Sequence, residues 1–243
     1  CIMSGPKEFL SACEERVFDR KHRDKLHFNI SQYDRKVVSG KQQYRDLELA
    51  KKRAASLKRK TIENLDKYLI EFEANFIRRG GKIIWAQDGE EAVSEILNIL
   101  QKKQVRTVVK SKSMTTEEID LNAALESAGI QPIETDLGEY IVQIRRERPY
   151  HIVTPAMHLS KEDVSATFHR QYGLPAGSSP EEITSFVRKR LRTKYPVAGA
   201  GITGANFLVA DTGAIAVTEN EGNALMSMAF PGVHIVIAGI EKL

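Results

Sequence analysis

The chain has 243 residues and a formal net charge of +4, with 42% hydrophobic and 28% charged residues, a composition typical of a globular protein with a substantial core. No apolar run approaches the roughly 20 residues of a membrane-spanning helix, and no secretory leader is recognisable, so we expect no membrane span. The two cysteines provide no disulfide framework, which favours a cytoplasmic location.

Residues 1–79 are predicted to form a basic helical arm. They contain 19 Lys and Arg against 12 Asp and Glu, whereas the remaining residues contain 17 against 20. Residues 1–45 are expected to be helical in separate pieces. From residue 46 to 79 apolar side chains then recur every three or four positions, which predicts one helix that ends at Gly80 and Gly81. No aromatic platform accompanies the basic charge, so we expect packing on the following domain or a partner subunit and no nucleic-acid binding.

Strands and helices alternate over residues 80–243, which we predict to be a separate domain. Strands are expected at residues 82–86, 105–110, 130–134, 151–154 and 233–239. The last is a continuous apolar run, typical of the centre of a parallel sheet. Helix starts are marked by Asp88, Thr115, Ser160 and Ser179, and the second of these helices is expected to end at Gly129. This pattern predicts an α/β fold with helices on both faces of a mainly parallel sheet, preceded by the helical arm.

The glycine-rich block at residues 199–223 imitates two known motifs. Gly199, Gly201 and Gly204 match the dinucleotide-binding pattern, which must follow a strand and open a helix. Here a helix is expected before the glycines and a hairpin after them, so we predict no dinucleotide site. The Asp-Thr-Gly at residues 211–213 resembles an aspartic-protease motif, but the chain lacks the second copy that a shared-proton pair requires. We therefore predict that it forms the turn of the hairpin.

Residues 110–113 and 134–139 follow expected strands of the parallel sheet, where ligands gather beyond the carboxyl ends. The ligand-binding candidates of the first motif are Lys110, Ser111, Lys112 and Ser113. Their ammonium and hydroxyl groups suit a phosphate or carboxylate, unless the segment is merely an exposed basic loop. The catalytic candidates of the second motif are Glu134, Asp136 and Glu139. Crowded acids can transfer protons when one pKa is raised, but these acids can equally neutralise the lysines or form a polar turn.

A third polar cluster ends the glycine-rich block and follows the expected hairpin. Glu219 and Glu221 are catalytic candidates, and the amides beside them suit the hydroxyls of a sugar-like or hydroxy-acid ligand, unless the cluster is an ordinary turn. The remaining ligand-binding candidates are Thr203, Asn206, Asn220, Asn223 and His158. His158 is as consistent with a surface histidine as with a ligand contact. No Cys or third His lies at metal-ligand spacing from the histidines, so we expect no metal site.

The sequence GITGANFLVADTGAIAVTENEGN at residues 201–223 resembles the signature of the LUD-domain family, found in the lactate-utilisation proteins. Further motifs agree in the same order. They are KSKSM at 110–114 with the glutamates at 117–118, ETDLGE at 134–139, HIVTPAMH at 151–158, the arginine-bearing helix through 190–192 and GIEK at 239–242. The resemblance covers roughly residues 50–243 and is strongest to the iron–sulfur subunit of bacterial lactate oxidation.

The resemblance implies a three-layer fold like that of the sugar isomerases and CoA-transferases. It also implies a cytoplasmic complex that oxidises L-lactate to pyruvate together with sister subunits, proteins A and C. Its [4Fe–4S] clusters are held by closely spaced cysteines in a C-terminal region. A cubane cluster needs about four thiolates, and this chain has only Cys1 and Cys13, so we expect no cofactor within it. We interpret the chain as the N-terminal part of a longer protein; a naturally short relative is the alternative.

Two other functions compete with this hypothesis. A free-standing enzyme of the isomerase or CoA-transferase type would act on a phosphorylated sugar or acyl-CoA, with Lys110 or Lys112 binding the anion and Glu134 or Glu219 moving protons or attacking an acyl group. A scaffold with a vestigial pocket would use none of these side chains. The first two hypotheses expect the lysine–serine loop, the acidic turn and the acid–amide corner to meet in one cleft at the rim of the sheet.

Overall fold

A four-stranded parallel sheet organises the protein, as seen in a computed structural model that describes residues 5–151, 154–219 and 221–243. The strands are β1 (Thr107–Lys110), β2 (Gln131–Glu134), β3 (Ala200–Gly204) and β6 (Val233–Ile237). Their order is β2-β1-β3-β6, and every pairing is parallel. Lys110 aligns with Glu134 on one side and with Ile202 on the other. The predicted α/β fold with a mainly parallel sheet is confirmed.

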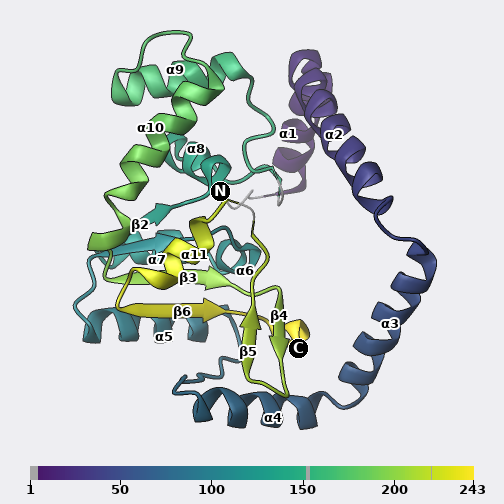
Figure 1. Ribbon diagram of the computed structural model, residues 1–243. Coiled ribbons are helices and arrows are strands. Elements are labelled where there is room, and N and C mark those ends of the chain that lie inside the picture. Colours follow the sequence, from purple (N-terminus) through teal and green to yellow (C-terminus); the bar gives the residue numbers. More distant parts are fainter. Residues whose placement is uncertain (1–4, 152–153, 220) are drawn as a thin grey trace.

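Helices cover both faces of this sheet, so the domain has three layers (Figure 1). Val108 packs in one hydrophobic cluster with α5 and α7, while its neighbour Val109 packs in the other with α8, α9 and α10, because successive strand side chains point to opposite faces. The helices of the domain are α5 (Gly89–Lys102), α6 (Met114–Glu118), α7 (Leu121–Ser127), α8 (Leu137–Arg145), α9 (Lys161–Tyr172), α10 (Pro180–Arg192) and α11 (Asn223–Ala229), with 3-10 turns η1 (Tyr195–Val197) and η2 (Ile240–Lys242).

Most helix starts lie where the sequence predicts them. Asp88 accepts a hydrogen bond from the backbone of Glu91, and Ser160 and Ser179 each form a capping box that opens α9 and α10. The prediction at Thr115 is wrong in detail. The helix begins after Ser113 and stops at Glu118, and α7 starts after a left-handed residue (φ 48°) at position 120, so two short helices replace the expected single one.

Three strand predictions need correction. Residues 82–86 form no strand, because they run outside the sheet between α4 and α5, where Ile84 and Trp85 are exposed. β6 lies at the edge of the sheet, not at its centre, since it pairs with β3 alone in the described part of the chain. For the strand expected at residues 151–154, His151 and Thr154 are not in a strand, and residues 152–153 lie outside the described residues.

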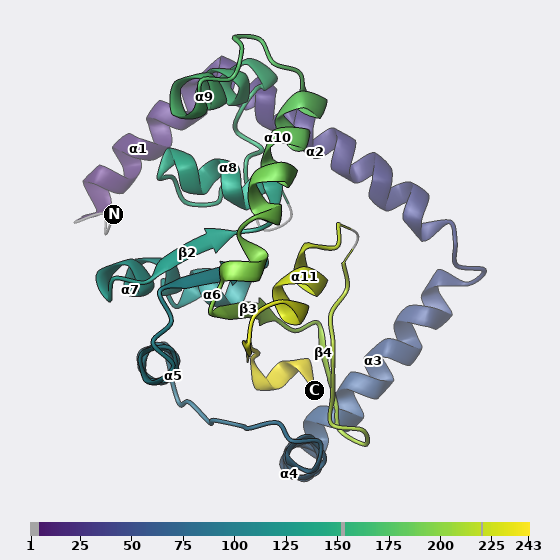
Figure 2. The same cartoon turned by 60° about the vertical axis from the view of Figure 1, so that its left-hand side comes forward.

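The N-terminal arm is helical, with one difference from the prediction. Its helices are α1 (Pro6–Phe18), α2 (Arg20–Lys41), α3 (Leu47–Glu63) and α4 (Leu65–Arg78). The single helix expected at residues 46–79 is interrupted at Asn64, whose backbone (φ −133°, ψ 34°) leaves the helical region. In Figures 1 and 2, α2 and α3 stand away from the sheet and α4 returns to the domain. Among the described helices, none combines enough length and apolarity to cross a membrane.

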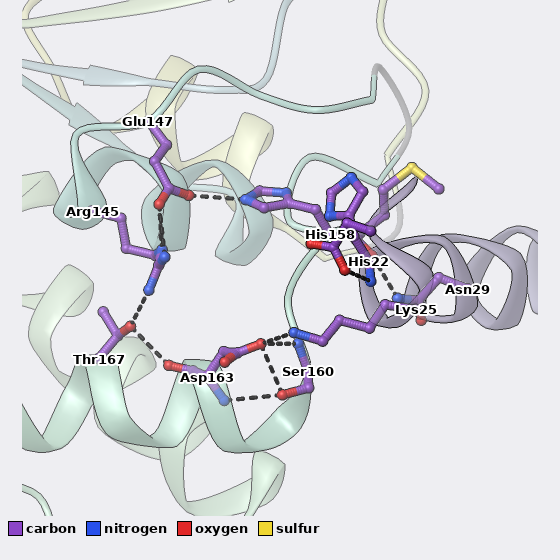
Figure 3. Close-up of polar contacts among 11 residues, drawn as sticks. His22, Lys25, Asn29, Arg145, Glu147, His158, Ser160, Asp163 and Thr167 are labelled. Carbon is purple, nitrogen blue, oxygen red and sulfur yellow. Dashed lines mark hydrogen bonds and ion pairs between the residues drawn. The ribbon is translucent and has the colours of Figure 1, made fainter. Parts of the chain in front are cut away.

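Side chains from three arm helices reach the α/β domain. Lys25 of α2 pairs with Asp163 of α9 at 2.5 Å, as Figure 3 shows. Asn29 of α2 donates to the carbonyl of Met157. Lys58 of α3 donates to the last carbonyl oxygen of the chain at 2.6 Å. Asn75 of α4 donates to the carbonyl of Ala210 in the hairpin. The arm is therefore attached at several separate points along its length.

The hairpin predicted around residues 211–213 is confirmed. Its strands β4 (Phe207–Val209) and β5 (Ala214–Ala216) are antiparallel, and Gly213 has a positive φ of 62° in the turn. The turn packs on α4 so closely that a Cβ at Gly213 would lie 2.4 Å from the backbone nitrogen of Phe76. The exclusion of a dinucleotide motif also holds: Gly201 and Gly204 lie inside β3, and a Cβ at Gly201 would lie 1.8 Å from the carbonyl oxygen of Ser227 in α11.

We expect Gly213→Ala to destabilise the protein more than Gly177→Ala. Gly177 also has a positive φ (78°), but its Cβ position is open, so alanine there adds only the left-handed backbone cost of about 1–2 kcal/mol. At Gly213 the clash with α4 adds to that cost. Urea unfolding should show a loss of free energy of unfolding at least twice as large for Gly213→Ala. Equal losses would mean that the hairpin does not depend on contact with α4.

Candidate functional site

A buried ion pair joins the carboxyl ends of the central strand β1 and its neighbour at the sheet edge, β2. Lys110 ends β1, Glu134 ends β2, and their Nζ and Oε1 atoms are 2.8 Å apart with 0% and 1% of each residue exposed. Glu117 of α6 approaches the same ammonium at 3.2 Å. Asn122 of α7 donates to Glu134 Oε1 at 2.7 Å. The parallel register dictates this meeting, because it places the last residues of β1 and β2 opposite each other.

The ammonium and the carboxylates determine one another's charge. Burial alone lowers the pKa of Lys110, but the charges of Glu134 and Glu117 outweigh it, and the net result is a raised pKa and a stable ammonium. Burial raises the pKa of Glu134 more than Lys110 and Asn122 lower it. Glu134 Oε2 is buried without a hydrogen-bond partner among the described residues. One carboxylate oxygen of the pair is therefore unsatisfied.

Glu139 is a second buried acid near this pair. It lies in the first turn of α8 and is 4% exposed. Burial, reinforced by the charges of Glu134 and Glu117, raises its pKa to about 8. A carboxyl group with a pKa near neutrality can both give and take a proton at physiological pH, which is the property required of a general acid–base group. Burial first, and the neighbouring acids second, therefore raise the pKa of Glu139.

The three polar motifs meet at this end of the sheet. Lys112 Nζ lies 3.9 Å from Asp136 Oδ2, which links the lysine–serine loop to the acidic turn. Partial burial and the negative charge of Asp136 raise the pKa of Glu221, and the charge of Lys112 opposes that effect. Glu221 thus lies within electrostatic range of both other motifs. The sheet brings together segments that are more than 80 residues apart in the sequence.

The lysine–serine loop is largely buried. Ser111 and Ser113 are 5% and 9% exposed, and Lys112 is half-buried, so the alternative of an exposed basic loop is wrong. Ser111 donates its backbone N–H to the carbonyl of Ile202, which continues the pairing of β1 with β3. Because Lys110 is neutralised inside the protein, it could bind an external anion only if its ion pair opened. Lys112 is the lysine of this loop nearer the surface.

Several other candidates hold the local structure. Asp136 caps α8 by accepting from the backbone of Glu139, and Glu219 Oε2 accepts from the backbone of Leu225 in α11. Asn223 begins α11 and accepts from the backbone of Ala224. Asn220 lies outside the described residues. These contacts account for the positions of the side chains and do not by themselves assign a ligand.

Thr203, Asn206 and His158 contact groups other than the Lys110 cluster. Thr203 is fully buried in β3 with its hydroxyl 2.9 Å from His234 Nε2. Asn206 accepts from the backbone of Thr218 and so closes the base of the hairpin. His158 stacks on Tyr150 with ring centres 5.0 Å apart, and its Nε2 lies 2.9 Å from Glu147 (Figure 3).

Sequence reasoning missed Asn122 and Gln143 and did not include Glu117 among the site residues. Glu117 shares the Lys110 ammonium, and Asn122 binds Glu134. Gln143 accepts from the backbone N–H of Glu134 and donates to the carbonyl of Pro132, which fastens α8 to the outer edge of β2. Their positions on α6, α7 and α8 are polar helix positions like many others. Of these three residues, only Glu117 could have been identified from the sequence, because the glutamate pair at residues 117–118 is part of the family pattern.

The metal-binding capacity of the chain is limited by its ligands. The sequence has two cysteines, Cys1 and Cys13, whereas a cubane cluster takes about four thiolates. In the part of the chain that the structure describes, no group of three or more His, Cys, Asp or Glu side chains is arranged to hold a metal ion. The residues of this chain therefore do not fit an iron–sulfur cluster.

Comparison with known proteins identifies the family. The LUD-domain family model matches residues 69–243, which includes most of α4 as well as the whole α/β domain. Proteins named Lactate utilization protein B are similar: that of Bacillus pumilus is 42% identical over 235 residues, covering 96% of this chain and 46% of the relative. The Geobacillus protein is 45% identical over 77% of this chain and 40% of its own length. The chain spans less than half the length of these relatives, and no solved structure matches it significantly.

We expect Lys110→Met to destabilise the protein strongly, because it leaves Glu134 and Glu117 without their cation. Loss of one partner of a buried pair costs about 3–5 kcal/mol. The double variant Lys110→Met/Glu134→Leu should recover part of that loss, since it also removes the stranded buried charge. Lys112→Met, which changes the same charge at a half-buried position, is the control. A double-mutant cycle of Lys110 and Glu134, measured by urea unfolding, that gave no coupling energy would contradict a stabilising interaction between the two side chains.

The raised pKa of Glu139 predicts that the stability of the protein depends on pH. Its pKa is about 8 in the folded protein, raised from 4.5, so the unfolded chain releases this proton first as pH rises. The stabilising contribution is complete below pH 4.5 and is lost by pH 8. Relative to Glu139→Gln, the wild type should therefore lose on the order of a few kcal/mol between these limits. Parallel pH profiles for wild type and Glu139→Gln would contradict the raised pKa, and the exposed Glu118→Gln serves as control.

Proposed function

This chain belongs to the LUD-domain family, and we propose that it is the LUD segment of an iron–sulfur subunit that serves lactate utilisation. The observation that carries the proposal is its similarity, across most of its length, to relatives named for that role. In this proposal the protein works in the cytoplasm, in a complex with sister subunits, the A and C proteins of lactate utilisation. The complex oxidises L-lactate to pyruvate, and electrons pass through [4Fe–4S] clusters bound outside this chain.

The rim of the sheet supplies the polar cleft in this proposal. Lys112 attracts the carboxylate of a small hydroxy acid, and Glu221 beside it contacts the hydroxyl group. Glu139, with its pKa near 8, and Glu134 hold or release a proton according to the charge that enters. The ion pair of Lys110 with Glu134 maintains the local field and keeps both strand ends fixed. Asp136, which caps α8, and Glu219, which binds the backbone of α11, hold the segments that carry these groups.

The basic arm supplies a docking surface. Residues 16–60 are rich in Lys and Arg, and only a few of these side chains, such as Lys25 and Lys58, are engaged with the chain's own domain. In Figures 1 and 2 the helices that carry them, α2 and α3, stand apart from the sheet. A surface of this kind suits an acidic face on a sister subunit.

One observation favours the second candidate, a free-standing enzyme acting on a phosphorylated sugar or an acyl-CoA. A buried acid with a pKa near neutrality beside a lysine-bearing loop is an arrangement found in active sites. This enzyme would bind its substrate without sister subunits. A rise of several degrees in the melting temperature on adding a phosphosugar or acyl-CoA, but not lactate, would favour it.

We expect the native protein, expressed from its own gene with the sister genes, to co-purify with iron, with the sister subunits and with lactate-oxidising activity. Reversing arm charges in Lys52→Glu/Arg59→Glu/Lys60→Glu should reduce co-purification about tenfold or more, because it repels an acidic partner. Arg188→Glu/Lys189→Glu/Arg192→Glu applies the same charge change to α10 and should leave assembly intact. Finding neither iron nor a lactate-oxidising partner would refute the lactate proposal. Equal losses in both charge variants would refute the role of the arm.

A further inference from the structure

A cavity of about 800 Å³ lies beside the outer edge of β2, and none of the candidate residues of the strand ends lines it. Its wall is built by β2 and by parts of α8, α9 and α10. Five cationic side chains line it, against two carboxylates, Glu126 and Glu147. The cationic residues are Arg145, Arg146, Arg170, Arg190 and Lys194. Arg190 belongs to the arginine-bearing helix of the family pattern, a motif that the proposed function leaves unused.

Most of this positive charge is not neutralised within the protein. Arg145 binds Glu147, with Nη2 2.7 Å from Oε1, and its Nη1 donates to Thr167 (Figure 3). The other four cations form no ion pair within 4 Å with any residue that the structure describes. With Arg145 paired to Glu147, four cations and one carboxylate, Glu126, remain around the cavity. The excess positive charge is self-repulsive, and an entering anion relieves that repulsion.

Arg190 is held in place before any ligand arrives. Its Nε donates to the hydroxyl of Tyr140 at 3.0 Å, and its guanidinium lies over the ring of Tyr172, 4.7 Å from the ring centre. The two tyrosine hydroxyls are 2.8 Å apart. Burial and the Tyr172 hydroxyl raise the pKa of Tyr140, so the phenol stays neutral and leaves the charge of Arg190 intact. A fixed guanidinium loses little side-chain entropy when it binds an anion.

The edge of β2 is closed to a peptide strand. The side chain of Gln143 accepts from the N–H of Glu134 and donates to the carbonyl of Pro132, and Pro132 itself has no N–H. An added strand would need those same backbone groups. The cavity also falls within the 300–1,000 Å³ typical of small-molecule pockets. Both observations favour a small molecule over a peptide.

We propose that this cavity binds a small-molecule anion carrying two or more phosphate or carboxylate groups, with Arg190 as its fixed anchor and Arg146, Arg170 and Lys194 as further cationic contacts. Guanidinium groups bind both kinds of oxyanion through paired N–H donors. None of the candidate catalytic or ligand-binding residues of the strand ends lines this cavity, although Gln143 lies in its wall and binds the backbone of Glu134. It therefore stands or falls independently of the lactate-utilisation proposal.

Calorimetric titration of the intact protein with pyrophosphate and, separately, with citrate tests the site. At least one of these probes should bind at 1 mM or below, and the preferred probe identifies the head group. Arg190→Ala should weaken binding tenfold or more, and Arg170→Gln severalfold. Arg188→Ala removes the same charge from the same helix but does not line the cavity, so it should change the affinity less than twofold.

Three results would overturn the proposal. They are no binding of either probe at 5 mM, equal losses for Arg190→Ala and Arg188→Ala, and unchanged binding in both cavity variants. Circular dichroism and the melting temperature of each variant establish that it is folded. If Arg190→Ala does not fold, the comparison of Arg170→Gln with Arg188→Ala decides: the proposal stands only if the cavity variant alone loses affinity.

Discussion

The ion pair of Lys110 with Glu134 is the constraint on which the rest of the domain depends. A buried ammonium and a buried carboxylate are each costly alone, so the fold must bring the ends of β1 and β2 together at hydrogen-bond distance. The parallel register does so, and α6 and α7 supply Glu117 and Asn122 as additional partners. Burial, reinforced by the charges of the neighbouring acids, then raises the pKa of Glu139. The same buried charges therefore determine both the stability of the strand ends and the protonation of the acids beside them.

The molecule separates two kinds of charge. The rim of the sheet holds an excess of buried acid around Lys110, whereas the arm and the cavity beside β2 present basic groups that are mostly unpaired in the described structure. The acidic rim suits proton transfer, and the basic surfaces suit anions and acidic partners. Lys25 of α2 and Asp163 of α9 form an ion pair that attaches the basic arm to the domain (Figure 3).

Much of the fold could be predicted because its signals are local. The caps at Asp88, Ser160 and Ser179 are reliable since the capping side chain and its backbone partner lie three residues apart. The turn at residues 211–213 could be predicted because it requires only residues that tolerate a positive φ, and these are recognisable from residue type. The errors have a different origin. Residues 82–86 are apolar enough for a strand but find no neighbouring strand, and β6 is mostly apolar although it lies at an edge. Which strand pairs with which depends on the packing of the whole sheet and not on the local sequence of one strand.

The sequence by itself determined the family, the α/β class, the basic arm and which three polar motifs follow the strands, because these depend on residue type and short-range spacing. Only the tertiary structure decided which groups meet. It buried Lys110 against Glu134, placed Glu221 within range of Lys112 and Asp136, and separated His158 from them. It also gathered Arg190 and Tyr140, 50 residues apart, at one cavity. Such contacts arise from strand order and helix packing, which local spacing does not encode.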